Sequence, residues 1–122
     1  MIKVYIAGAM RDHSPIVFLN NLQKGIRAGA ELVMAGYAPF CPMLDSQYFL
    51  QLREPEEITA KMIMDVSMEW LMQCSAVLVL PGWENSEGTI REINRARIVS
   101  IPVFFSFIDL EYHFKGEVTD EK

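Results

Sequence analysis

The sequence has few cysteines and histidines, and their spacing matches no metal-binding or redox motif. Cys41 and Cys74 form no CxxC pair, and His13 and His113 lie near opposite ends of the chain. This spacing favours two reduced thiols that pack as small apolar side chains. It predicts no metal site.

The sequence also lacks an excess of basic residues and a long apolar run. Eleven lysines and arginines stand against sixteen aspartates and glutamates, for a net charge of -5, which disfavours binding of duplex DNA or RNA by counterion release. No apolar run approaches the roughly 18 residues that span a bilayer, and residues 1–8 do not resemble a signal peptide. We therefore expect a cytoplasmic protein without a membrane partner. A free nucleotide stays possible, because one arginine and a helix N-terminus can bind a single phosphate.

The length and composition indicate one compact domain. A chain of 122 residues with 51% apolar residues is long enough for one hydrophobic core and too short for two ordinary domains. We expect this domain to cover residues 1–114. Residues 115–122 form a charged tail that we expect to fray.

Short apolar runs alternate with helical patterns along the chain. Strands are predicted at 2–7, 37–41, 76–80 and 102–105, and helices at 14–36, 59–74 and 86–99, whereas the connection 43–57 is predicted to hold at most one helical turn. This alternation predicts an α/β fold with a doubly wound, flavodoxin-like or Rossmann-like parallel sheet of four to five strands. Ligands bind at the carboxyl ends of such strands, so the loops 8–14 and 81–86 are the candidate binding loops.

Apolar residues recur at helical spacing in the first two predicted helices. The predicted core-facing residues are Leu19, Leu22, Ile26, Ala30 and Val33 in the first helix, and Ile63, Val66, Trp70 and Cys74 in the second. Gly25 and Gly29 each cost the first helix about 1 kcal/mol relative to alanine, which predicts a compensating close approach of another segment.

The start of the third predicted helix has the features of an anion site. Ser86 is a good N-cap, and the free N–H groups and positive dipole end of the helix lie nearby. Gly88 and Glu92 share a helix face, and the missing side chain at Gly88 leaves room for a ligand beside the carboxylate. Ile90 and Ile93 are assigned to the core.

Each candidate side chain also has a purely structural interpretation. Glu92 could be a solvated glutamate paired with Arg91 or Arg95. Tyr5 could be a core tyrosine, and Arg11 a solvated loop arginine. Trp83 is a candidate wall for base stacking, or it covers the core or a subunit contact.

Three motifs together resemble the nucleoside 2-deoxyribosyltransferase-like superfamily. They are Tyr5-Ile-Ala-Gly8-Ala-Met-Arg11, Glu69-Trp70-Leu71 and Ser86-Glu-Gly88-Thr-Ile-Arg-Glu92-Ile-Asn-Arg95-Ala96. The resemblance covers about residues 2–105. It implies a small-molecule nucleoside or nucleotide partner, no metal or other cofactor, and a homodimer or higher homo-oligomer. The aromatic run Phe104, Phe105, Phe107, Tyr112 and Phe114 offers apolar surface for that contact, although core packing explains part of it equally well.

The resemblance also implies roles for individual residues. Glu92 matches the nucleophile that attacks the anomeric carbon, and Tyr5 matches the residue that orients it. The carboxylate suits an oxocarbenium-like transition state, and we expect the nearby helix N-terminus to keep it ionised. Arg11, Ser86 and Gly88 match positions that hold a 5'-phosphate. Gly8 lies in the same candidate binding loop as Arg11, residues 8–14.

Ser67 departs from the enzymes, which carry an aspartate two residues before the Glu-Trp-Leu motif. Asp65 is a poor substitute, because it points away from a face centred on Trp70. A general acid typically contributes about 100-fold to 10,000-fold. Among the loop carboxylates Asp45, Glu84 and Asp12, we favour Asp45 for this role.

Three functions are consistent with these residues. The first is cleavage or transfer at the N-glycosidic bond of a nucleoside or nucleoside 5'-monophosphate through Glu92. The second is a nucleotide-binding module without catalysis, which Ser67 favours. The third, a structural protein that has lost the pocket, is disfavoured by Gly88 and Glu92.

Overall fold

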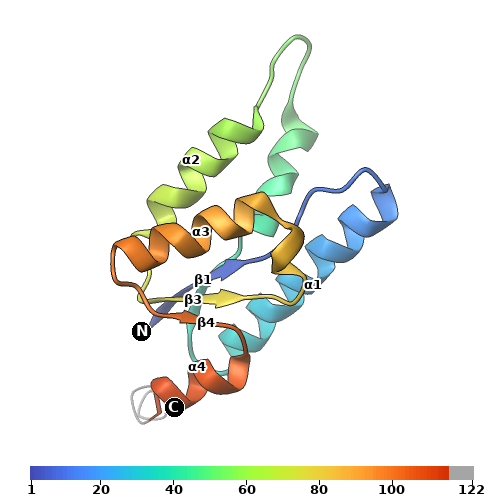
Figure 1. The fold of residues 1–122 in the computed structure, drawn as a ribbon. Coiled ribbons are helices and arrows are strands. Elements are labelled where there is room, and N and C mark those ends of the chain that lie inside the picture. The colour runs from blue at the N-terminus through green and yellow to red at the C-terminus, as the bar shows by residue number, and fades with distance from the viewer. Residues whose placement is uncertain (116–122) are drawn as a thin grey trace.

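A computed structural model describes residues 1–115 of the chain and shows a four-stranded sheet covered by helices (Figure 1). The strands are β1 (Lys3–Ala7), β2 (Ala38–Phe40), β3 (Ala76–Val79) and β4 (Val103–Phe104). They pair in the order β2-β1-β3-β4, and each pair is parallel. The predicted doubly wound sheet is therefore confirmed, with four strands.

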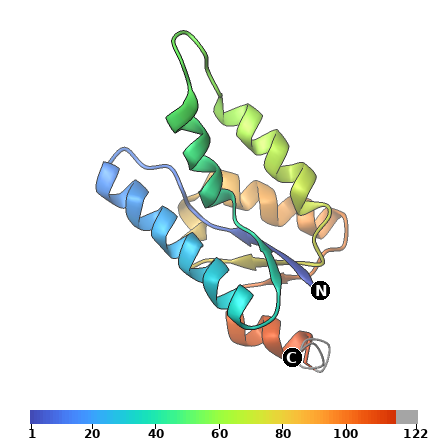
Figure 2. The same cartoon turned by 180° about the vertical axis from the view of Figure 1, so that it is seen from behind.

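Helices cover both faces of this sheet (Figures 1 and 2). The helical elements are α1 (Pro15–Met34), the 3-10 segment η1 (Pro42–Gln51), α2 (Ala60–Leu71), the 3-10 turn η2 (Trp83–Asn85), α3 (Glu87–Ile98) and α4 (Phe107–His113). Residues of α1 and α4 pack on one face, and residues of α2 and α3 pack on the other. None of the helices in this part of the chain combines the length and the apolar character needed to cross a membrane.

Strand β1 supplies both cores because successive side chains of a strand point to opposite faces. Val4 and Ile6 join the core under α1 and α4, whereas Tyr5 and Ala7 join the core under α2 and α3. The side chains of strand β3 also alternate between the two cores, and the strand is buried on both sides, as predicted. Tyr5 is thus placed beneath α2 and α3 by the strand alternation alone.

The side of α1 that packs on the sheet differs from the predicted one. Its buried residues are Gly25, Ala28, Gly29 and Leu32, while Leu19 is 60% exposed and Val33 61% exposed. These small residues allow other segments to approach α1 closely, as Gly25 and Gly29 predicted. A β-carbon at Gly25 would lie 2.5 Å from Met43 Cγ, and one at Gly29 would lie 3.5 Å from Ile6 Cδ1.

Other elements also differ from the sequence prediction. The connection after β2 holds the ten-residue segment η1 rather than one turn, and α4 was not predicted. Ile93 is buried, but Ile90 is 36% exposed and the prediction that it is a core residue was wrong. Of the predicted tail, residues 115–122, all but residue 115 lie outside the described part of the chain.

The aromatic run near the C-terminus and the two cysteines have mixed outcomes. Phe114 is buried and Phe104 and Phe107 pack against the same core, whereas Phe105 and Tyr112 are exposed. Core packing therefore explains part of this run, and the subunit contact stays a prediction. Cys41 and Cys74 are free and buried, as expected for packed thiols.

The strand order places the two candidate loops next to each other. The chain passes from β1 to β2 on one side of β1, and then returns to β3 on the other side of β1. The direction in which strands are added to the sheet therefore reverses between β1 and β3. The loops that follow these two strands are 8–14 and 81–86. Open parallel sheets bind their ligands at this position.

Candidate active site

The centre of the candidate site is a buried contact between Tyr5 and Glu92. The Tyr5 hydroxyl donates a hydrogen bond to Glu92 Oε2. Tyr5 is fully buried on β1, and Glu92 on α3 is 6% exposed. A solvated glutamate paired with Arg91 or Arg95 is therefore wrong, and Arg91 instead lies 3.8 Å from Glu87.

Burial dominates the electrostatics of this pair. It raises the pKa of Glu92 from 4.5 to about 7, and the hydrogen bond from Tyr5 opposes that rise. Burial and then the charge of Glu92 raise the pKa of Tyr5, which stays a neutral donor. The expectation that the helix N-terminus keeps Glu92 ionised was wrong, because the dipole effect fades beyond the first turn and Glu92 lies in the second.

Ser67 on α2 is the third polar residue of this cluster. It is 3% exposed, and its hydroxyl acts to lower the pKa of Tyr5, against the larger effect of burial. Ser67 is thus buried in the helix that packs on the same side of the sheet as Tyr5. Asp65 is exposed and pairs with Lys61 at 2.7 Å, so it stays away from the site as predicted.

The buried face of α2 is centred on Ser67 and Leu71 rather than on Trp70. Trp70 is 53% exposed, and its ring stacks on Phe40 with centroids 5.7 Å apart. Phe40 stacks in turn on Tyr5 at 5.6 Å. The prediction that Trp70 is the centre of the core face was therefore wrong, and Trp70 forms the outer end of an aromatic stack over Tyr5.

The start of α3 carries the predicted cap. Ser86 Oγ accepts hydrogen bonds from the Thr89 backbone N–H at 3.2 Å and from the Thr89 hydroxyl at 2.8 Å. Gly88 faces α2, where Met64 Cε lies 3.2 Å from the position of an added β-carbon. The space expected for a ligand at Gly88 is thus occupied by a flexible methionine end.

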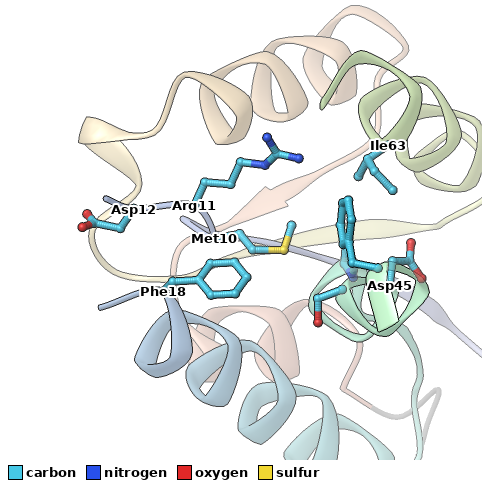
Figure 3. Close-up of a pocket in the computed structure, with 9 residues that line it drawn as sticks. Met10, Arg11, Asp12, Phe18, Asp45 and Ile63 are labelled. Atoms are coloured by element: carbon cyan, nitrogen blue, oxygen red, sulfur yellow. The ribbon is translucent and has the colours of Figure 1, made fainter. Parts of the chain in front are cut away.

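A cavity of about 380 Å³ lies between the loop after β1, α1, η1 and α2 (Figure 3). Met10, Arg11 and Phe18 approach it from one side, and Asp45 and Ile63 from the other. The full lining is Met10, Arg11, Asp12, Phe18, Pro42, Asp45, Ser46, Phe49 and Ile63. Ile63 and Ser67 are four residues apart on α2 and share one helix face, but Ser67 does not line the cavity.

Two of the predicted binding residues, Arg11 and Asp45, line this cavity. Asp12 also lines it, but its carboxylate accepts a hydrogen bond from the Ser14 backbone N–H at 2.9 Å and points away from the cavity in Figure 3. Burial raises the pKa of Asp45 above 3.8. Asp45 is therefore a carboxyl that holds its proton more firmly than a solvated aspartate.

The other predicted binding residues lie around the cluster rather than in the cavity. Trp83 packs against the hydrophobic core that contains Tyr5. Its ring also packs on the ring of Phe105, and the two ring centroids lie 5.3 Å apart. Gly8 is required by packing, because an added β-carbon would lie 2.9 Å from Leu80 Cδ1. Glu92 itself is not among the residues that line the cavity.

Sequence reasoning missed several residues of this region. Phe40 contacts Tyr5, Met64 contacts Gly88, and Met10, Phe18 and Phe49 form apolar walls of the cavity. Phe40 was detectable as the last aromatic residue of the predicted strand 37–41. Across residues 1–115, no group of three or more histidine, cysteine, aspartate or glutamate side chains is placed to hold a metal ion.

Comparison with known proteins agrees with the motifs. No curated protein matches the chain. A 2-deoxyribosyltransferase from Bacillus psychrosaccharolyticus has a similar structure, with a TM-score of 0.59 and 19% sequence identity over 83% of this chain and 69% of that one. This likeness shows the fold, and the resemblance to the nucleoside 2-deoxyribosyltransferase-like superfamily is confirmed at that level. Residues 2–105 match the family model described as Domain of unknown function (DUF4406), and the chain belongs to that family.

Proposed function

We propose that the protein cleaves or transfers the N-glycosidic bond of a nucleoside or nucleoside 5'-monophosphate, with Glu92 as the nucleophile. The observation that carries this proposal is the buried hydrogen bond between Tyr5 and Glu92. The same domain holds a cavity of about 380 Å³ that is lined by Arg11 and Asp45. A buried carboxylate that accepts a hydrogen bond from a neutral tyrosine is oriented for attack and shielded from water. The similar fold of a 2-deoxyribosyltransferase supports this choice of reaction.

The reaction proceeds in two balanced steps. A Glu92 carboxylate oxygen forms a bond to the anomeric carbon while the bond from that carbon to the base nitrogen breaks. The electron pair leaves with the base, which takes up a proton. Water or a second base then attacks the same carbon and gives a proton to the group that protonated the first base. The ester bond to Glu92 breaks, and its electron pair restores the carboxylate.

Asp45 is the proposed donor of the proton to the leaving base. It lines the cavity, and burial raises its pKa above that of a solvated aspartate, which is the direction that favours a general acid. Ser67 cannot fill this role as an acid, since a serine hydroxyl is not acidic at neutral pH.

Arg11 and the start of α3 are the proposed phosphate site. Arg11 is an exposed cation at the cavity and shows no ion pair among residues 1–115. The N-terminus of α3 adds free backbone N–H groups close to Ser86 and Gly88. The preference for 2'-deoxyribose rests on the family resemblance alone.

A nucleotide-binding module without catalysis is the second candidate. Two features favour it: burial raises the pKa of Glu92 to about 7, which disfavours the ionised nucleophile, and Glu92 does not line the cavity. A ligand would then bind between Arg11 and Asp45 and leave intact.

Incubation with a panel of ribo- and deoxyribonucleosides and their 5'-monophosphates separates the two candidates. Free base is followed by chromatography, and the melting temperature of the protein is followed in parallel. Free base is expected for at least one compound. A rise in melting temperature without base would support the binding module, and no effect of any compound would contradict both proposals.

A further inference from the structure

Three aromatic rings from three different elements form a stack that ends on Tyr5. The ring of Phe40 on β2 stacks on the ring of Tyr5 on β1, with centroids 5.6 Å apart and planes that differ by 19°. The ring of Trp70 on α2 stacks on Phe40 in turn, with centroids 5.7 Å apart and planes that differ by 17°. These separations are typical of aromatic pairs that attract one another. Phe40 is the middle ring, because it contacts both others.

The register of the sheet brings Phe40 to Tyr5. Strands β1 and β2 are parallel, and Tyr5 and Phe40 are partners in their register. Side chains at paired positions lie on the same face of a sheet and contact one another, and Phe40 packs against the core that contains Tyr5. Since β2 is an edge strand, the ring that contacts Tyr5 comes from the edge of the sheet, and Trp70 packs that ring against α2.

The donation from Tyr5 to Glu92 depends on how the tyrosine ring is held. Conjugation keeps the phenol O–H bond in the plane of the ring, so the ring plane sets the direction in which the proton points. Hydrogen bonds weaken steeply when that direction is poor. A ring stacked on Tyr5 also blocks a sideways tilt, which would carry the hydroxyl away from the Glu92 carboxylate that accepts its proton.

We propose that Phe40 is a positioning residue, whose ring, held by Trp70, fixes the ring plane of Tyr5 so that the tyrosine hydroxyl donates to Glu92. The inference rests on the proposed function, in which Glu92 is the nucleophile. Phe40 and Trp70 do not line the cavity, so their effect on the reaction passes through Tyr5. The orientation of the nucleophile then depends on the edge strand β2 and on α2, as well as on β1 and α3.

The first test needs no substrate, because the hydrogen bond from Tyr5 favours the ionised form of Glu92. The titration of Glu92 is followed by carbon NMR of labelled glutamate carboxyls, with the Glu92 signal assigned by its loss in Glu92→Gln. Phe40→Leu keeps an apolar side chain but removes the flat ring, and the titration midpoint is expected to rise by about half a pH unit. Tyr5→Phe removes the whole hydrogen bond, so its midpoint should rise further. Trp70→Ala should raise the midpoint by a smaller amount than Phe40→Leu.

Changes of charge do not disturb this comparison. The substitutions at positions 40 and 70 exchange one uncharged side chain for another, and the charged residues of α2 and α3 other than Glu92 are exposed to solvent. Cys74 lies in the same core as Tyr5, and burial raises its pKa to about 11, so it keeps its proton throughout the titration. A moved midpoint therefore reports on the contact between Tyr5 and Glu92.

Phe40→Tyr and Val66→Ala are the matched controls. Tyrosine at position 40 keeps the flat ring, and Val66 is 48% exposed on α2, one helical turn before Trp70, so both midpoints should stay close to that of the wild type. An unchanged or lowered midpoint in Phe40→Leu, or a Phe40→Tyr midpoint that moves as far as the leucine one, would overturn the inference. If Phe40→Leu does not fold, Trp70→Ala is compared with Val66→Ala, and equal midpoints would overturn it.

The second test uses a nucleoside or nucleotide from which the wild type releases base. At pH 8, Phe40→Leu should lower kcat about tenfold and leave KM nearly unchanged, because the ring does not line the cavity. A raised KM with an unchanged kcat would place Phe40 in substrate binding and overturn the inference. If the midpoints shift as expected while the wild type releases no base from any compound, the positioning role stands and the proposed reaction fails.

Discussion

Tyr5 and Glu92 lie 87 positions apart in the sequence, yet the hydroxyl of the first donates a hydrogen bond to the carboxylate of the second. The parallel sheet makes this contact possible, because β1 is an interior strand and α3 packs across the face to which Tyr5 points. Burial of both groups removes the carboxylate from water and raises the pKa of Glu92, and the hydrogen bond from Tyr5 only partly offsets this rise. The raised pKa has measurable consequences.

Base release is expected to depend on pH through Glu92. Burial raises the pKa of Glu92 to about 7, and only the ionised carboxylate is a nucleophile. In Asp45→Asn, which removes the second titrating carboxyl of the proposed reaction, the remaining kcat/KM should therefore rise about tenfold between pH 6 and pH 8. A profile that is flat over this range would show that the ionisation of Glu92 does not limit the reaction.

The same ionisation should affect the free energy of unfolding. The pKa of Glu92 is raised by folding, so its contribution to stability is fully present below about pH 4.5 and is lost as the pH rises through about 7. Glu92→Gln mimics the protonated form at every pH. Its stability relative to the wild type should increase by about 2–3 kcal/mol between pH 5 and pH 8, as measured by urea unfolding.

The matched control for this measurement is Glu87→Gln, on the same helix. Glu87 is exposed and lies 3.8 Å from Arg91. An exposed ion pair contributes about 0–1 kcal/mol, so the control should show a small and nearly pH-independent change. Equal pH dependence in the two variants would contradict the burial of Glu92.

Arg11→Ala should weaken the binding of 5'-monophosphates more than that of nucleosides. A charge-assisted hydrogen bond to phosphate contributes about 1.5–3 kcal/mol, so the Kd or KM of a monophosphate should rise about tenfold or more. Arg27→Ala, which removes an exposed arginine on α1 that pairs with Glu31, is the control. Equal losses for nucleosides and monophosphates would mean that Arg11 does not contact the phosphate.

Gly25→Ala and Gly29→Ala should have opposite effects on stability. A β-carbon at Gly25 would lie 2.5 Å from the Cγ and Sδ of buried Met43, and such overpacking costs about 1–3 kcal/mol. At Gly29 the added carbon meets Ile6 Cδ1 at an ordinary 3.5 Å, so the gain of about 1 kcal/mol in helix propensity should remain. Thermal unfolding of the two variants checks this difference.

The sequence predicts the fold well because alternating strands and helices allow few topologies. The order of elements, the expected right-handed crossovers and the buried strand at 76–79 together imply a parallel sheet, and the observed strand order agrees. The matching strand and helix boundaries differ from the observed ones by only a few residues. Segments without a strong periodic pattern, such as η1 and α4, were missed.

The sequence predicts helix faces less well, because periodicity does not show which face of a helix meets the sheet. In α1 the apolar residues Leu19 and Val33 are exposed, and small residues that permit close packing face the strands instead. In α2 the buried residues are Ser67 and Leu71, whereas Val66 and Trp70 of the predicted core face are exposed. Motif resemblance identified Tyr5 and Glu92, but their burial, and hence the raised pKa of Glu92, required the three-dimensional arrangement.

Base release by Glu92→Gln decides whether Glu92 is the nucleophile. The initial rate is measured at pH 8 for the wild type, for Glu92→Gln and for Glu31→Gln, an exposed glutamate of α1, with ligand-induced stabilisation recorded for each. Glu92→Gln should lose at least about a thousandfold in rate and keep its stabilisation by ligand, while Glu31→Gln should match the wild type. Wild-type turnover by Glu92→Gln would contradict a covalent mechanism through Glu92.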